Sequence, residues 1–324
     1  MDATTQMAVV GMALPMAVGV VAGLACSRRQ AADKKPASAT AGAPSPEGSA
    51  PSEAGASPAR AFFVRLLLVV AAGLIAWLAM FGVGGAGSWP PVSSEDRLKA
   101  VPIVGAVLVG VLVVSFGRMG SRSALGAVTG AAVMGLVATV MVIWPRMIGA
   151  GVAPLGERLL WCVAAAACAA LAAWPIVRLE QRGLRISSAA ILTGLAAAVG
   201  AGLAGTDSLK LGQMAFGIAA GCAGLLIVVL ARRTLTIGGA AAVVIAVLTA
   251  LAAAGHAFSG TPLWLALGLA AVPMCGYVAG RAVEKKVGPL AAALVRIGAA
   301  AVAAAALVAP GIIELARFAA KSGG

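Results

Sequence analysis

The chain has 324 residues, of which 61% are hydrophobic and only 11% are charged. Soluble domains are roughly 45–50% apolar and about 25% charged, so this composition excludes an ordinary soluble domain. The formal net charge is +13, but the basic residues stand in ones, twos and threes at the ends of apolar runs. Orientation determinants of membrane proteins have this placement, which argues against a nucleic-acid partner.

The apolar runs are long enough for membrane-spanning helices, each of which needs roughly 20 apolar residues. Only helices and closed barrels satisfy every backbone amide inside lipid. Barrel strands alternate in polarity and form aromatic girdles, whereas these runs are uniformly apolar and aromatic residues make up 4% of the chain. The sequence therefore predicts an all-α, polytopic membrane bundle with about ten transmembrane helices.

The first predicted span, Met7 to Cys26, is an N-terminal anchor within residues 1–26. Asp2 precedes it and no base does, whereas four bases follow within the next nine residues. A secretory signal peptide has the opposite polarity, with its positive charge first. We therefore expect an uncleaved helix with its N-terminus outside. The alternative is a lipoprotein signal ending at Cys26, but the basic segment that such a signal needs is missing.

Residues 27–60 are rich in Pro, Ala, Ser and Gly and have almost nothing to bury. Such a segment cannot offset the entropy lost on ordering, so we expect a disordered tether. Residues 61–324 are predicted to be a nine-span bundle with short loops and no soluble domain. The predicted spans of this bundle are Phe62–Val83, Val101–Phe116, Ala124–Trp144, Leu159–Val177, Ile186–Ala204, Gly212–Ala231, Ile237–Ala254, Leu263–Gly280 and Pro289–Pro310.

The second of these spans, Val101–Phe116, is short for a bilayer. We expect it to extend through Pro102 into the preceding loop, or to sit in a thinned patch of membrane.

The distribution of bases predicts the orientation. With the tether on the cytoplasmic side, the cytoplasmic segments hold sixteen of the 24 bases and the outer segments hold seven, with Arg296 set aside. This is the positive-inside bias, and it places both termini outside. The short loops, and a composition that favours Ala and Arg over Lys, suggest the inner membrane of a bacterium.

Arg296 is the one base that falls well inside a predicted span, Pro289–Pro310. A bare arginine at mid-bilayer costs about 2.5–3.5 kcal/mol on insertion scales. The side chain could snorkel to the cytoplasmic headgroups, or the span could slide to Ile297–Leu315. Arg296 could also pack against another helix and cap its carbonyls, or bind an anionic group in a wet cavity. No acidic residue is central to a span, so no counter-ion for Arg296 is evident.

Pro273 lies inside the ninth span and is followed by Tyr277, the only tyrosine. A proline frees a helix carbonyl and kinks the helix, and broken helices often flank transporter sites. Tyr277 could bond the freed backbone, although a plain structural kink accounts for the proline equally well. Arg296, Pro273 and Tyr277 are therefore the candidate substrate or cavity residues.

The sequence predicts no cofactor, no metal and no enzyme. His256 is the only histidine and is expected at the surface or the membrane interface. None of the five cysteines forms a CxxC pair, so small buried side chains are the simplest interpretation. Nucleophile, phosphate-binding and metalloprotease motifs are absent. Four GxxxG pairs, of which Gly276/Gly280 is one, allow close helix packing.

Two functions fit these features. The first is a carrier or channel for a small uncharged, lipophilic or weakly anionic solute, for which Arg296 and the interrupted ninth span argue. The second is a non-catalytic scaffold subunit of a membrane complex, which needs nothing beyond small-residue helices. The expected partners are the lipid bilayer and other membrane helices, and no soluble partner is indicated. An enzyme that acts on lipid would need a catalytic set, which the spans do not supply.

Overall fold

The computed structural model describes residues 11–32, 58–84, 93–117, 123–147, 155–206, 209–232 and 235–322. Within these ranges every regular element is a helix, which confirms the predicted all-α fold. The helices are α2 (Leu14–Ala32), α3 (Pro58–Gly84), α4 (Ser94–Gly117), α5 (Ser123–Met147), α6 (Leu155–Gln181), α7 (Arg185–Ala204), α8 (Leu209–Arg232), α9 (Gly238–Ser259), α10 (Leu263–Val283) and α11 (Pro289–Ser322).

Seven of the described helices are long and apolar enough to cross a membrane. The chain is therefore a multi-pass membrane protein. Among the described residues, length and composition support seven spans, whereas the sequence predicted about ten. The apolar part of α2, Gly11–Cys26, is shorter, and α4 and α10 are not among the seven. The seven segments are Phe63–Val83, Leu125–Val142, Leu159–Gln181, Arg185–Ala204, Leu209–Arg232, Gly238–Ser259 and Pro289–Pro310.

Two boundaries show how local sequence sets the helix ends. Helix α4 begins at Ser94 and runs through Pro102, which confirms the expected extension of the short span. Its start is a capping box, because the amide of Asp96 donates to Ser93 Oγ at 3.1 Å and the amide of Ser93 donates to the Asp96 carboxylate at 3.3 Å. Helix α2 runs to Ala32, beyond the predicted boundary at Cys26. Helix α3 begins at Pro58, before the predicted end of the tether at Arg60. The rest of the predicted tether, residues 33–57, lies outside the described residues.

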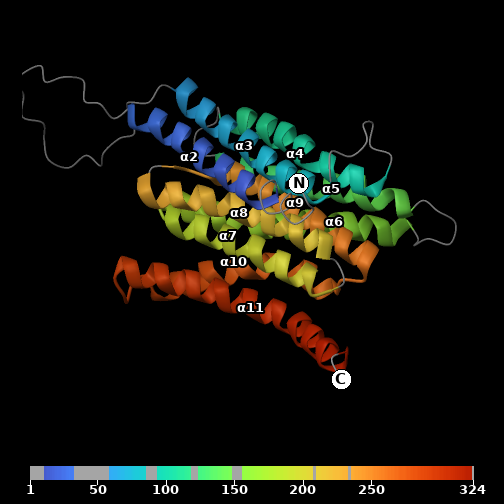
Figure 1. Ribbon diagram of the computed structural model, residues 1–324. Coiled ribbons are helices and arrows are strands. Elements are labelled where there is room, and N and C mark those ends of the chain that lie inside the picture. Colours follow the sequence, from blue (N-terminus) through green and yellow to red (C-terminus); the bar gives the residue numbers. More distant parts are fainter. Residues whose placement is uncertain are drawn as a thin grey trace, which may run out of the picture.

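Helix α9 is the centre of the bundle. Every residue from Ala240 to Gly255 is buried, so the helix presents apolar side chains all round to its neighbours. Helices α3, α4, α5 and α6 pack around it. Helix α11 lies along one edge of the molecule (Figure 1, red) and contacts α10 and α7.

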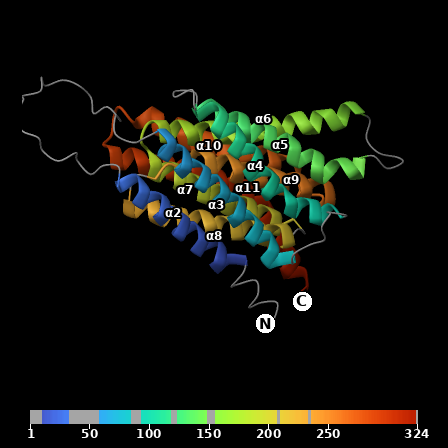
Figure 2. The same cartoon turned by 90° about the horizontal axis from the view of Figure 1, so that it is seen from above.

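Glycines allow α2 to lie directly on α8, as both views show (Figures 1 and 2). A Cβ on Gly224 would lie 3.1 Å from the Val20 amide nitrogen, and a Cβ on Gly19 would collide with the Gly221 carbonyl. The two backbones therefore touch. Small residues at helix contacts are the usual basis of helix association in membranes.

Candidate functional site

Two helix turns meet at one end of the bundle. The α6–α7 turn closes at Gly183, which has a φ of 76° that only glycine adopts at no steric cost. Its amide donates to the Glu180 carbonyl at 2.8 Å. The α10–α11 turn carries Glu284, whose carboxylate accepts a hydrogen bond from Arg182 at 3.3 Å. This contact joins two turns that are 102 residues apart in sequence.

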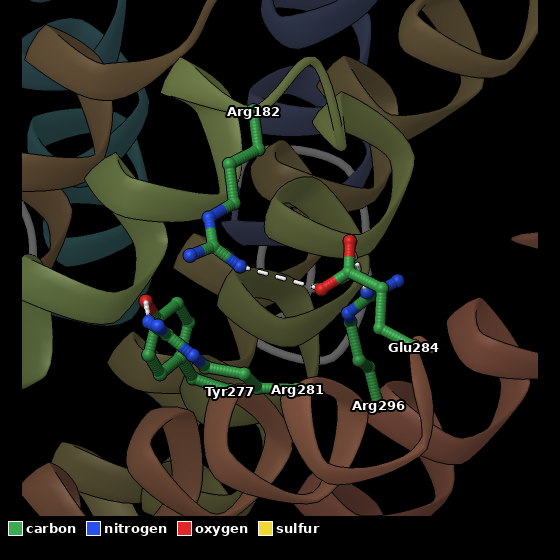
Figure 3. Close-up of polar contacts among 5 residues, drawn as sticks. All are labelled: Arg182, Tyr277, Arg281, Glu284 and Arg296. Atoms are coloured by element: carbon green, nitrogen blue, oxygen red, sulfur yellow. Dashed lines mark hydrogen bonds and ion pairs between the residues drawn. The ribbon is translucent and has the colours of Figure 1, made fainter. Parts of the chain in front are cut away.

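Arg296 lies on the inner side of α11, where its side chain is 2% exposed. Its Nη2 atom is 3.3 Å from Oε1 of Glu284. Glu284 is 40% exposed and Arg182 is 36% exposed, so the carboxylate stands between one buried and one accessible guanidinium (Figure 3). Two positive groups share a single negative group at this point.

The pair Gly276/Gly280 on α10 makes room for Arg296. A Cβ on Gly280 would lie 2.7 Å from Cδ of Arg296. A Cβ on Gly276 would lie 2.9 Å from the backbone carbonyl oxygen of Arg296. The glycine pair thus forms the wall against which the arginine stem packs.

The expectation that Arg296 has no evident counter-ion was wrong. Glu284 lies outside the span in sequence, but the α10–α11 turn brings its carboxylate back to the guanidinium. Arg296 does pack against a neighbouring helix, α10. Its guanidinium pairs with the carboxylate of Glu284, and not with backbone carbonyls as one of the expectations had it.

Tyr277 lies beside the charged group of Arg182, Glu284 and Arg296, and Pro273 lies one turn deeper in α10. The Tyr277 side chain is 5% exposed, and its hydroxyl accepts a hydrogen bond from Arg281 at 3.2 Å (Figure 3). Helix α10 is continuous from Leu263 to Val283 across Pro273. The structure thus brings Tyr277 and Arg296 to the same end of the bundle.

Sequence reasoning missed an aromatic and arginine stripe on α6. Trp174 packs edge-on against Tyr277 with ring centroids 5.2 Å apart. The guanidinium of Arg178 lies over the Trp174 ring at 5.8 Å, and that of Arg182 lies over the Tyr277 ring at 5.6 Å. The signal was present in the sequence as the spacing of 174, 178 and 182, which puts three side chains on one helix face.

Sequence reasoning also missed Glu180, which caps the central helix. Its carboxylate accepts a hydrogen bond from the amide of Ile237 and another from that of Gly238, at the start of α9. The N-cap residue, Ile237, has an apolar side chain that cannot accept a hydrogen bond from the helix amides. The guanidinium groups of Arg65 and Arg185 lie close enough to interact with the carboxylate. A negative group at a helix N-terminus is stabilising.

His256 lies at the other end of the bundle. Its ring stacks on Trp161 with centroids 4.6 Å apart, and its Nδ1 atom is 2.6 Å from the Thr261 carbonyl oxygen. The Thr261 hydroxyl is 3.0 Å from that of Thr206. Within the described part of the chain, no group of three His, Cys, Asp or Glu side chains could hold a metal ion.

Hydroxyls inside the spans bond their own helices. Thr139 donates to the Gly135 carbonyl at 2.7 Å, and Thr249 donates to the Ile245 carbonyl at 2.8 Å. These groups are satisfied without a solute.

A groove of about 560 Å³ separates parts of α3 and α4, and apolar side chains and glycines line it. Its lining includes the exposed Val70, Ile103 and Val107, so it faces outward.

Compared with family models, with curated proteins and with solved structures, the chain matches none of them.

Proposed function

We propose that this protein is a membrane carrier for a small, largely apolar solute with one negative charge, and that Arg296 binds that charge. The observation that supports the proposal is the shared carboxylate of Glu284, which lies between a buried and an exposed arginine. A permanently charged group is costly inside a membrane, and where one is found it commonly marks a binding path.

Glu284 occupies the position that a solute anion would take. Two guanidinium groups on one carboxylate leave an excess of positive charge at the site. Because Glu284 is 40% exposed, its carboxylate can turn into water without leaving a buried negative charge. A carboxylate, sulfonate or phosphate group of the solute would then replace it between Arg182 and Arg296, since arginine pairs readily with each of these groups.

The surroundings suit a solute that is otherwise apolar. Beyond Arg296, the inner face of α11 continues with Ala300 and Ala304, small side chains that leave space for the solute if α11 moves away from α10. Helix α11 lies at the edge of the bundle and packs against two helices, α10 and α7. An edge helix with few partners can move with less loss of packing than the buried α9. A bacterial inner membrane, with the α6–α7 and α10–α11 turns in the cytoplasm, is part of this proposal.

The second candidate is a non-catalytic subunit that scaffolds a membrane complex. The bonding of the span hydroxyls within their own helices favours it, because these groups need no solute. In that case the Arg296–Glu284 pair only fastens α11 to α10. Neither proposal includes a catalytic step.

Uptake into proteoliposomes tests the carrier. Hexanesulfonate is a suitable probe, because it keeps its negative charge at every practical pH and crosses protein-free bilayers slowly. We expect the wild type to accelerate its uptake above protein-free liposomes and Arg296→Met to abolish the gain. Lys286→Ala, an exposed change in the same turn, should retain it. Uptake by the wild type that equals the protein-free rate would favour the scaffold.

A further inference from the structure

Helices α6 and α10 present matching faces at the end of the bundle where their turns meet. On α6, Trp174, Arg178 and Arg182 follow one another at intervals of one turn. On α10, Tyr277 and Arg281 have the same spacing and the same order. Each helix thus places an aromatic ring deeper in the bundle and arginines nearer its end.

Ring contacts join the two faces into one surface. Trp174 and Tyr277 meet edge to face, with centroids 5.2 Å apart. Arg178 lies over the Trp174 ring at 5.8 Å, and Arg281 donates a hydrogen bond to the Tyr277 hydroxyl at 3.2 Å. The aromatic pair therefore holds guanidinium groups from two helices near one another, which lowers the entropy lost when they bind an anion together.

Accessible apolar side chains continue the same surface toward the middle of the membrane. Leu171 is 51% exposed and lies two turns from Arg178, on the same face of α6. Val278 is 58% exposed and lies one turn from Arg281, on the same face of α10. The accessible surface is therefore basic at the end of the helices and apolar deeper, and the buried Tyr277 ring packs on Trp174 behind it. Aromatic rings collect at the headgroup level of membranes.

From this arrangement we propose that the α6–α10 surface binds an anionic phospholipid. Arg178 and Arg281 would donate to the phosphate diester, Trp174 and Tyr277 would support them, and the acyl chains would lie along Leu171 and Val278. Basic pockets between spans on the cytoplasmic side bind anionic headgroups in this way. Glu284 engages Arg182 and Arg296, so the site relies on the other two arginines and does not require the solute-binding role of Arg296.

The order of polarity along the surface favours a lipid over a free phosphate ion. A free ion would use only the guanidinium groups. A lipid would also cover the exposed Leu171 and Val278, which lie two turns and one turn below Arg178 and Arg281, respectively.

Thermal unfolding of the full-length protein in neutral detergent tests this proposal. A ligand that binds the folded state raises the unfolding temperature, and the dependence on ligand concentration gives an apparent Kd. We expect dioctanoyl phosphatidylglycerol to raise the unfolding temperature and dioctanoyl phosphatidylcholine to have a much smaller effect. Inorganic phosphate should have none. An equal effect of phosphatidylcholine would overturn the anionic specificity, and an effect of phosphate alone would overturn the lipid assignment.

Variants separate the headgroup contacts from the chain contacts. Arg178→Gln together with Arg281→Gln should raise the apparent Kd for phosphatidylglycerol roughly tenfold or more, since each base near the surface contributes to the attraction. Leu171→Ser together with Val278→Ser should also raise it. Arg232→Gln, an exposed base at the end of α8, is the matched control and should leave it unchanged. An apparent Kd that stays at the wild-type value in both double variants would overturn the proposal, and the unfolding temperature without lipid reports whether each variant folds.

Discussion

At the scale of residues, the burial of a charged side chain, Arg296, is the feature with the largest energetic cost. Its guanidinium is buried against α10, and its carboxylate partner is contributed by an accessible turn. Removing one member of such a pair costs more than the pair itself stabilises, because the remaining charge is left without compensation.

The first prediction concerns Glu284→Gln. This change removes the negative charge that Arg182 and Arg296 share, so we expect the free energy of unfolding to fall by about 1–3 kcal/mol. In Arg296→Met, which places an apolar side chain of similar length on Gly280, the further change Glu284→Gln should cost less than in the wild type. Unfolding by sodium dodecyl sulfate in mixed micelles measures both. Equal costs in the two backgrounds would show that the pair does not interact.

The second prediction concerns Gly280→Ala. The added Cβ would collide with the stem of Arg296, so we expect a loss of about 1–3 kcal/mol from overpacking. Gly298→Ala on α11 is the matched control, because a Cβ there meets nothing within 4 Å. That change should be neutral or stabilise the helix by up to about 1 kcal/mol. Equal unfolding of the two alanine variants would contradict a close approach of α10 and α11 at Gly280.

At the scale of elements, the cap of α9 connects the most buried helix to the charged end of the bundle. Glu180 on α6 accepts hydrogen bonds from the Ile237 and Gly238 amides, although the first of them lies 57 residues away. The contact fixes where α9 begins.

The third prediction follows from this cap. Glu180→Ala should destabilise the protein by about 1–2 kcal/mol, as the loss of a cap does elsewhere. Glu180→Gln should cost less, because its amide oxygen can still accept one of the two hydrogen bonds. The exposed neighbour provides the control Gln181→Ala, with an effect below about 0.5 kcal/mol. Hydrogen exchange of the first amides of α9 measures the local effect, and unchanged protection in Glu180→Ala would contradict the capping role.

The elements also show what the sequence could predict. The predicted run Pro289–Pro310 coincides with the part of α11 that is long and apolar enough to cross a membrane, because hydrophobic length alone decides such a segment, whereas the helix itself continues to Ser322. The extension of α4 through Pro102 followed from the same length argument. The Arg182–Glu284 and Glu180–Ile237 contacts could not be predicted, since they join distant turns whose meeting depends on how whole helices pack. The positions of Glu180, Arg182 and Glu284 in the sequence gave no sign of these partners.

At the scale of the molecule, polar contacts join helix turns at both ends of the bundle. The pair Arg182–Glu284 joins the α6–α7 and α10–α11 turns, and Glu180 reaches the start of α9. The contact between Thr206 and Thr261 joins the α7–α8 and α9–α10 turns. Successive turns in this part of the chain therefore lie at alternate ends of the bundle.

The fourth prediction concerns sidedness. In a version without the five native cysteines, Lys285→Cys should react with a membrane-impermeant thiol reagent only from the cytoplasmic side. Lys210→Cys, at the start of α8, should react only from the outer side. The positive-inside bias is the physical reason. Labelling of both positions from the same side would contradict the topology, and the reversed pattern would contradict the orientation.

The measurement that tests the carrier most directly is the depth to which water reaches along α11. In the same cysteine-free version, Ala300→Cys would stand one turn beyond Arg296 on the inner face, and Val302→Cys would stand on the outer face, where Val302 is 70% exposed. The carrier account predicts that the impermeant reagent labels Ala300→Cys from the cytoplasm and spares the lipid-facing Val302→Cys. If Ala292→Cys reacts but Ala300→Cys does not, water stops at Arg296, and the result would contradict a path for a solute through the bundle.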